Sequence, residues 1–160
     1  MIQKIPSMGD NELTILYQNC LREITNATPQ VASAQLIVDA INDEWNKRLR
    51  AASAGGYKAE TPAIGVLSTV GYHVGHQGET RVRRRKLLDY VFTSTLPPVG
   101  SPAHMLEWGT PKSRERYRKL HRVLSTFLTA GSNDAKLGLA CAHWEDDLRY
   151  IEETWAPSLG

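Results

Sequence analysis

The stretch 134–155, DAKLGLACAHWEDDLRYIEETW, carries the clearest structural pattern in the chain. Its apolar residues recur at alternating steps of four and three, namely Leu137, Cys141, Trp144, Leu148, Ile151 and Trp155. This spacing places them along one face of an α-helix and is typical of a coiled-coil seam. The pattern predicts a helix that begins at Asp134 and packs on other helices.

Helical periodicity also runs through the rest of the chain, and alternating strand patterns are scarce. It predicts long helices over 8–25, 29–52, 80–94 and 110–131, and short helices near 61–70 and 101–108. Ser7 and Asp10 form an S-x-x-D start, and Thr-Pro or Ser-Pro pairs begin four further helices, at 28–29, 61–62, 101–102 and 110–111. The predicted fold is therefore all-α, a bundle of about six or seven helices.

One linker divides the predicted helices. Residues 1–53 form a predicted N-terminal helical hairpin, 54–60 a linker that includes Gly55 and Gly56, and 61–160 a C-terminal helical domain. A lone two-helix hairpin is marginally stable. We therefore expect the hairpin to pack on 61–160 or to form a homodimer, with the stripe around Trp45 as the contact.

Composition excludes several classes of protein. The 160 residues are 41% hydrophobic and 22% charged, with a mean hydropathy of −0.37 and no long apolar run. This argues against a membrane span and against a disordered chain. Cys20 and Cys141 are too few for a disulfide framework. We expect a cytoplasmic protein with reduced, buried cysteines.

Charge is strongly segregated although the net charge is only +2. Residues 79–122 hold eleven basic and four acidic side chains, and residues 123–160 hold two basic and six acidic ones. A basic block is typical of a protein that binds phosphate backbones, but it can also pair with an acidic helix of the same chain. The candidate contact residues are Arg81, Arg83, Arg85, Lys86, Trp108, Arg118, Lys119 and Arg122.

Helical geometry separates these candidates. Arg84 lies on an apolar stripe and needs a partner there, either an acid from 145–147 or a ligand phosphate. Arg118, Lys119 and Arg122 are predicted to lie opposite the apolar stripe of their helix. Trp108 either joins two helices or presents an aromatic surface beside the basic residues.

The loop 71–78, GYHVGHQG, is the most unusual local sequence. Its glycines let a backbone approach a ligand, and Tyr72, His73 and His76 are candidate ligand contacts. A structural turn is the alternative interpretation. The loop lacks a P-loop lysine, and the chain has no CxxC or G-x-S-x-G motif, so we expect no cofactor and no metal.

These observations favour a non-enzymatic regulatory domain that binds nucleic acid through its helices at 80–94 and 111–130. A protein-interaction or inhibitor module that binds an acidic partner is the alternative. An enzyme that uses the loop 71–78 is a third possibility.

Several landmarks of the C-terminal part form a familiar series, namely GVLSTVGYHVG (65–75), RRRKLLDYVF (83–92), LPPV (96–99), SPAHMLEWGTP (101–111) and WEDDLRYI (144–151). In these landmarks the chain resembles small helical domains of unassigned function in bacterial proteins. The resemblance implies a bacterial or phage source and marks 61–160 as the defining unit.

Overall fold

The computed structural model describes residues 1–54, 65–99 and 102–159, and all regular structure in these ranges is helical. The all-α class is therefore confirmed, with seven α-helices in the described ranges. The chain forms two compact units, one from Met1–Gly71 with Leu96–Pro102 and the other from Tyr72–Thr95 with Ala103–Gly160. Within the described residues, no helix has the length and apolar character needed to span a membrane.

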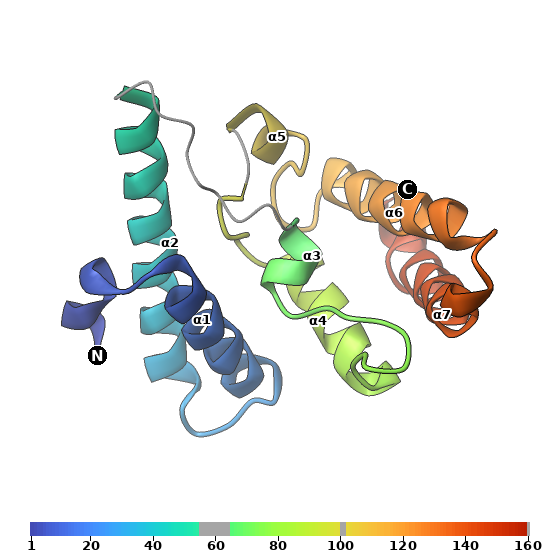
Figure 1. The fold of residues 1–160 in the computed structure, drawn as a ribbon, viewed down its shortest axis with the longest axis horizontal. Coiled ribbons are helices and arrows are strands. Elements are labelled where there is room, and N and C mark those ends of the chain that lie inside the picture. The colour runs from blue at the N-terminus through green and yellow to red at the C-terminus, as the bar shows by residue number, and fades with distance from the viewer. Residues whose placement is uncertain (55–64, 100–101, 160) are drawn as a thin grey trace. The chain divides into compact units, whose positions relative to one another are not determined.

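The first unit is built on an antiparallel helical hairpin. It contains the 3-10 helix η1 (Ile2–Ser7), α1 (Asp10–Thr25), α2 (Val31–Ala54) and the short α3 (Val66–Thr69). Helices α1 and α2 lie side by side and run in opposite directions (Figure 1). Both predicted apolar stripes form their shared core, where the rings of Tyr17 and Trp45 are 5.4 Å apart.

The start of α1 differs from the prediction. Ser7 and Asp10 do not form a capping box, because the Ser7 hydroxyl donates to the carbonyl of Lys4. The N-cap is Gly9, and its amide donates to the Glu12 carboxylate over 2.8 Å. The negative side chain of Glu12 also suits the positive end of the helix dipole.

Helix α3 belongs with the hairpin. The side-chain amide of Gln18 on α1 donates to the carbonyls of Ser68 and Thr69 at 3.4 and 3.2 Å. Gly71 ends this segment with a φ of 94°, a conformation that strongly favours glycine. The chain first passes from one unit to the other after Gly71. Most of the predicted linker, 54–60, lies outside the described residues.

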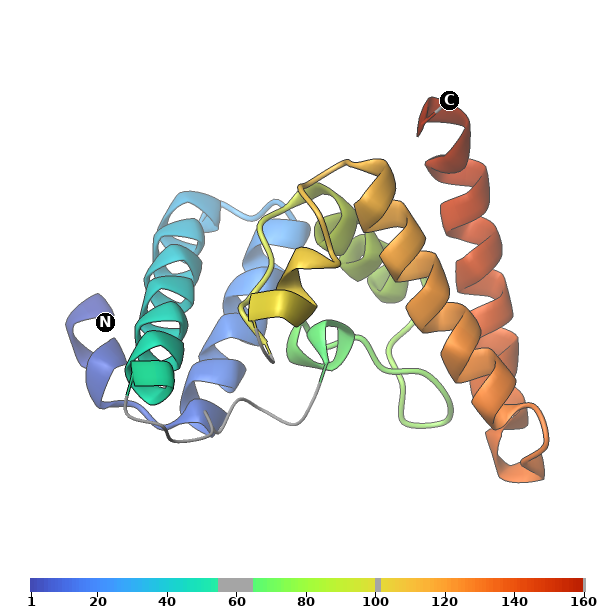
Figure 2. The ribbon, with the colours of Figure 1, turned by 90° about the horizontal axis from the view of Figure 1, so that it is seen from above.

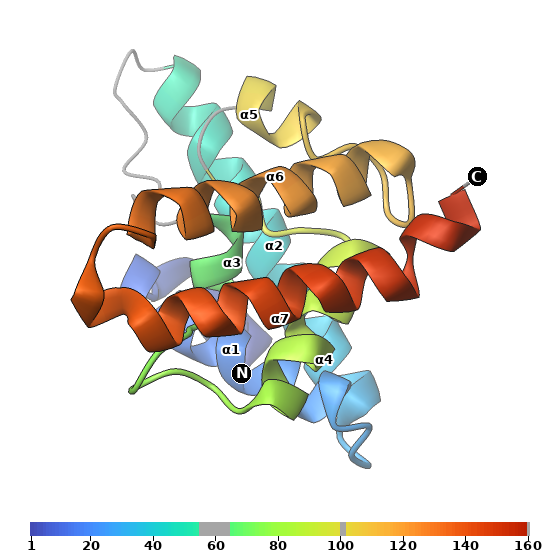
Figure 3. The same cartoon turned by 90° about the vertical axis from the view of Figure 1, so that its right-hand side faces the viewer.

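The second unit places two long helices against a third. Its elements are α4 (Arg81–Thr93), α5 (Pro102–Leu106), α6 (Arg114–Gly131), η2 (Ala135–Leu137), α7 (Gly138–Thr154) and η3 (Ala156–Leu159). Helices α6 and α7 lie side by side and antiparallel (Figures 2 and 3). Helix α4 packs against both.

The predicted Thr-Pro start of α6 is wrong. Thr110-Pro111 precedes a turn in which Lys112 has a φ of 62° and its amide donates to the carbonyl of Phe92. The helix begins at Arg114 instead, with Ser113 as the N-cap that accepts from the Arg116 amide at 3.0 Å. The expected end at Gly131 is confirmed.

The other helix starts that were predicted from Thr-Pro or Ser-Pro pairs are confirmed only in part. Pro102 is the first residue of α5, but Ser101 and the pair 61–62 lie outside the described residues. Thr28-Pro29 stands in the turn before α2, which begins two residues later at Val31. Likewise, Asp134 caps η2 through the amide of Lys136, and α7 follows from Gly138.

The hairpin core predicts a contrast between two aliphatic positions on α1. Leu21 is fully buried and Ile15 is 61% exposed. Leu21→Ala should lower the free energy of unfolding by about 2–5 kcal/mol, because it leaves a cavity. Ile15→Ala should change it by about 0.5 kcal/mol or less. Urea unfolding followed by circular dichroism measures both, and equal losses would contradict the assignment of the core.

Candidate functional site

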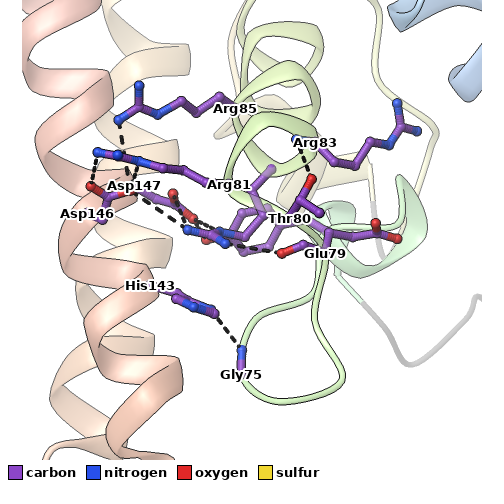
Figure 4. Close-up of polar contacts among 11 residues, drawn as sticks. Gly75, Glu79, Thr80, Arg81, Arg83, Arg85, His143, Asp146 and Asp147 are labelled. Atoms are coloured by element: carbon purple, nitrogen blue, oxygen red, sulfur yellow. Dashed lines mark hydrogen bonds and ion pairs between the residues drawn. The ribbon is translucent and has the colours of Figure 1, made fainter.

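A buried carboxylate, Asp147 on α7, organises the polar centre of the second unit (Figure 4). Its side chain has no exposed surface. It accepts from the Nε and Nη2 atoms of Arg84 at 2.8 and 3.2 Å and from the Tyr72 hydroxyl at 2.6 Å. Burial, and then the charge of Asp147, raise the pKa of Tyr72 far above its usual range, so this hydroxyl remains a donor.

Arg84 extends this centre to the start of α4. Its Nη1 atom donates to the carbonyl of Glu79 at 3.1 Å. The next residue, Thr80, is the N-cap of α4, and its hydroxyl oxygen accepts from the Arg83 amide at 3.2 Å. The expectation that Arg84 has a core partner is confirmed, and the partner is an acid rather than a phosphate.

The neighbouring Asp146 gathers the other arginines of α4. Arg81 donates to both of its oxygens at 2.8 and 2.6 Å, and Arg85 lies 3.9 Å away (Figure 4). Burial alone would raise the pKa of Asp146, but the hydrogen bond and charge of Arg81 outweigh it and hold that pKa below its usual value. Arg85 also places its guanidinium 4.6 Å above the Tyr150 ring.

Most of the charge of α4 is therefore directed toward the acidic helix α7. Arg83 and Lys86 are half-buried, and neither is without a partner. The pairing that the sequence offered as the alternative to phosphate binding thus holds for Arg81, Arg84 and Arg85. The acids that hold these arginines lie some sixty residues later in the sequence.

The glycine-rich segment 71–78 forms a closed turn. The Gly78 amide donates to the Gly75 carbonyl at 3.1 Å, and Gly75, with a φ of 86°, donates its own amide to Nδ1 of His143 at 3.0 Å. His73 and His76 are exposed. Tyr72, which the sequence made a ligand contact, is buried with its hydroxyl bound to Asp147.

An open pocket of about 520 Å³ lies beside this turn. Of its charged lining residues, Arg81, Arg84 and Asp146 are already paired with one another or with Asp147, and Glu79 is not without a partner. No cluster of three or more His, Cys, Asp or Glu suited to a metal occurs in the described residues. The structural role of the turn accounts for its glycines.

Arg116 is a second buried arginine, which the sequence analysis counted as part of the basic block. It donates to the carbonyls of Trp108 (2.9 Å), Ser94 (2.8 Å) and Gly109 (3.1 Å), and also to Val91. Burial lowers the pKa of Arg116 to about 10. Its spacing with the buried Leu120 and Leu124 was the signal that could have revealed it, since the three follow one another at intervals of four residues.

Two predicted contact residues turn out to be internal. Trp108 is buried, so it joins segments and presents no aromatic surface. The Lys119 side chain is only 11% exposed and donates to the Glu107 carboxylate at 2.6 Å, with its Nζ atom 5.9 Å from the Trp108 ring. Lys119 therefore does not belong to the exposed face of α6.

Arg118 and Arg122 are exposed, as predicted. Within the described part of the chain, neither has a hydrogen bond or an ion pair. They line an open groove of about 520 Å³ together with Tyr117, His121 and Ser125. We call this the α6 groove. In it, two guanidinium groups that form no hydrogen bond or ion pair lie beside an aromatic ring.

His121, Ser125 and Glu152 form a short polar chain across α6 and α7. Nε2 of His121 lies 2.8 Å from the Glu152 carboxylate, and Nδ1 lies 3.3 Å from the Ser125 hydroxyl. The order resembles a nucleophile, a base and an orienting acid. However, Ser125 lies inside α6, where neighbouring backbone amides are committed to the helix and cannot stabilise an oxyanion. The arrangement therefore does not favour acyl transfer.

No protein-family model, curated protein or solved structure matches this chain. The resemblance to small bacterial helical domains therefore gains no support from these comparisons.

Two of the arginines on α4 that contact acids, Arg84 and Arg81, predict different losses of stability. Arg84→Ala should lower the free energy of unfolding by about 3–5 kcal/mol, because it leaves the carboxylate of Asp147 buried beside no positive charge. Arg81, whose side chain is 60% exposed, is the matched control, and Arg81→Ala should cost about 1 kcal/mol or less. Chemical unfolding of both variants tests this ranking, and similar losses would contradict it.

His143 predicts a pH dependence of stability. Burial, and then the charge of Arg84, hold the pKa of His143 below the value of about 6.5 that it has when unfolded. The unfolded chain therefore takes up this proton first, and stability should fall as the pH drops below about 6.5. Protonation also removes the acceptor for the Gly75 amide.

His143→Gln should flatten the stability curve below about pH 6.5, because glutamine accepts a hydrogen bond without titrating. His73→Gln, in the exposed part of the same turn, is the control and should leave the curve unchanged. Urea unfolding at a series of pH values measures the effect. A curve that keeps its slope in His143→Gln would show that another group is responsible.

Proposed function

We propose that this chain is a non-enzymatic module that binds the phosphate groups of nucleic acid through the exposed face of α6. One observation carries the proposal. Arg118 and Arg122 stand exposed one helical turn apart, and in the described residues neither forms a hydrogen bond or an ion pair. The Glu107 carboxylate, which Lys119 holds, is the acid that feels the charge of Arg122. Guanidinium groups in this state are suited to phosphate oxygens.

The scaffold behind these two side chains is rigid. Leu120 and Leu124, on the opposite side of α6, are fully buried, so the helix cannot rotate about its axis without losing its core. Arg116 fixes the start of the helix through four carbonyl acceptors. A fixed helix holds the two guanidiniums in a defined relation, which lowers the entropy lost on binding.

The proposal is narrower than the expectation from sequence. Helix α4 supplies no large free basic surface, because Arg81, Arg84 and Arg85 are held near acids of α7. Two strong phosphate contacts imply weak binding with a modest dependence on salt. A regulatory role and a cytoplasmic location belong to the same proposal. The free cysteines Cys20 and Cys141 are compatible with that location.

The test compares Arg118→Gln/Arg122→Gln with wild type by fluorescence anisotropy on labelled DNA and RNA at about 50 mM salt. The wild type should bind, with log affinity falling against log salt at a slope of about −2 for two duplex contacts. The double variant should lose binding while keeping its fold, because both side chains point away from the core. Lys47→Gln/Lys136→Gln removes the same charge from exposed positions outside α6 and should bind normally.

Two outcomes would overturn the proposal. One is the absence of binding by the wild type to any nucleic acid at low salt. The other is equal binding to polyglutamate, which would assign the face to an acidic protein partner instead.

A further inference from the structure

The α6 groove contains more than charge. Besides Arg118 and Arg122, it is lined by the phenol ring of Tyr117 and the imidazole ring of His121. The two ring centres are 5.8 Å apart and the rings are tilted by 47°. Tyr117 is only half-buried, so part of the ring faces the groove. An aromatic surface therefore adjoins the two unpaired guanidiniums on the same helix.

The orientation of the His121 ring is fixed from both sides. The Glu152 carboxylate can only accept, so Nε2 carries the proton that bridges their 2.8 Å separation. In the neutral ring, Nδ1 is then an acceptor, and the Ser125 hydroxyl donates a hydrogen bond to it over 3.3 Å. Both ring nitrogens are thus occupied, and what the ring offers to a ligand is its face.

We propose that the α6 groove holds one unpaired nucleobase against Tyr117 and His121 while Arg118 and Arg122 hold the adjoining phosphates. This inference rests on the proposed function, and it specifies the ligand as single-stranded nucleic acid. Stacking on an aromatic side chain beside basic groups is the general way in which proteins bind single strands without reading their sequence.

The geometry favours a single strand over a duplex. In a duplex each base is stacked between its neighbours and paired, so its face is not accessible to Tyr117. A duplex would then make only the phosphate contacts of two arginines, which lie about 6 Å apart along the helix axis. A single strand makes the same phosphate contacts and adds a stacked base. A groove of about 520 Å³ also lies within the size range of small-molecule sites.

The test uses three strands of equal length, namely oligothymidylate, its duplex with oligoadenylate, and a wholly abasic strand with the same sugar-phosphate backbone. The abasic strand carries the charge without the bases. Wild-type protein should bind oligothymidylate about fivefold to a hundredfold more tightly than the abasic strand. The duplex should bind as weakly as the abasic strand at matched salt.

Two variants locate the effect. Tyr117→Leu keeps an apolar side chain but removes the ring, so it should remove the advantage of oligothymidylate and leave abasic binding unchanged. Phe127→Leu makes the same change at another exposed aromatic of α6 that does not line the groove, and it should retain the advantage. Thermal unfolding of each variant shows that the comparison is made on folded protein.

The outcomes separate this inference from the proposed function. Equal affinity for oligothymidylate and the abasic strand, with Arg118→Gln/Arg122→Gln still abolishing both, would overturn the stacking groove and leave phosphate binding intact. Tighter binding to the duplex would likewise overturn it. No binding to any of the three strands would overturn both proposals. The comparison among strands uses wild-type protein, so it decides the matter even where a variant unfolds.

Discussion

The second unit depends on one buried carboxylate. Asp147 loses its hydration when α7 packs, and that loss must be offset by partners inside the unit. Arg84 supplies the charge and Tyr72 a third hydrogen bond. Since these partners come from α4 and from the segment before it, satisfying the carboxylate fixes where α4 stands on α7. Asp146, next to it, then takes up Arg81 at the surface.

The arginines of this chain show why a count of charges is a poor guide to a binding surface. Arg84 neutralises a buried acid. Arg116 is buried and donates to backbone carbonyls. Arg81 forms a bidentate ion pair at the surface. Each adds one unit to the net charge of the basic block. Only a side chain that is exposed and has no partner remains available to a ligand, and its position on the helix decides whether it does.

Much of the fold follows from the sequence because burial is periodic. The periodicity that predicted the long helices agrees with their burial, since Leu13 on α1, Val38 on α2 and Leu120 on α6 are all buried. Helix starts were harder, because Gly9 and Ser113 outcompete Ser7 and Thr110 through contacts that depend on the local turn. Of the candidate site, Arg118 and Arg122 were placed correctly. Trp108 takes the first of its two predicted roles, since it is buried between segments. Lys119 was placed wrongly, because a sequence pattern does not record which neighbour, here Glu107, folds back on a side chain.

The hydrogen bonds around the two buried arginines, Arg116 and Arg84, also differ in the sequence separation that they bridge. The hydrogen bonds of Arg116 span at most 25 residues, whereas those of Asp147 to Arg84 and Tyr72 span 63 and 75. The entropic cost of closing a loop grows with the logarithm of this separation. Closing 75 residues therefore costs about 1 kcal/mol more than closing 25 residues. Arg116 thus sets local geometry at small entropic cost. Asp147 sets topology, because its bonds form only when distant segments have already met.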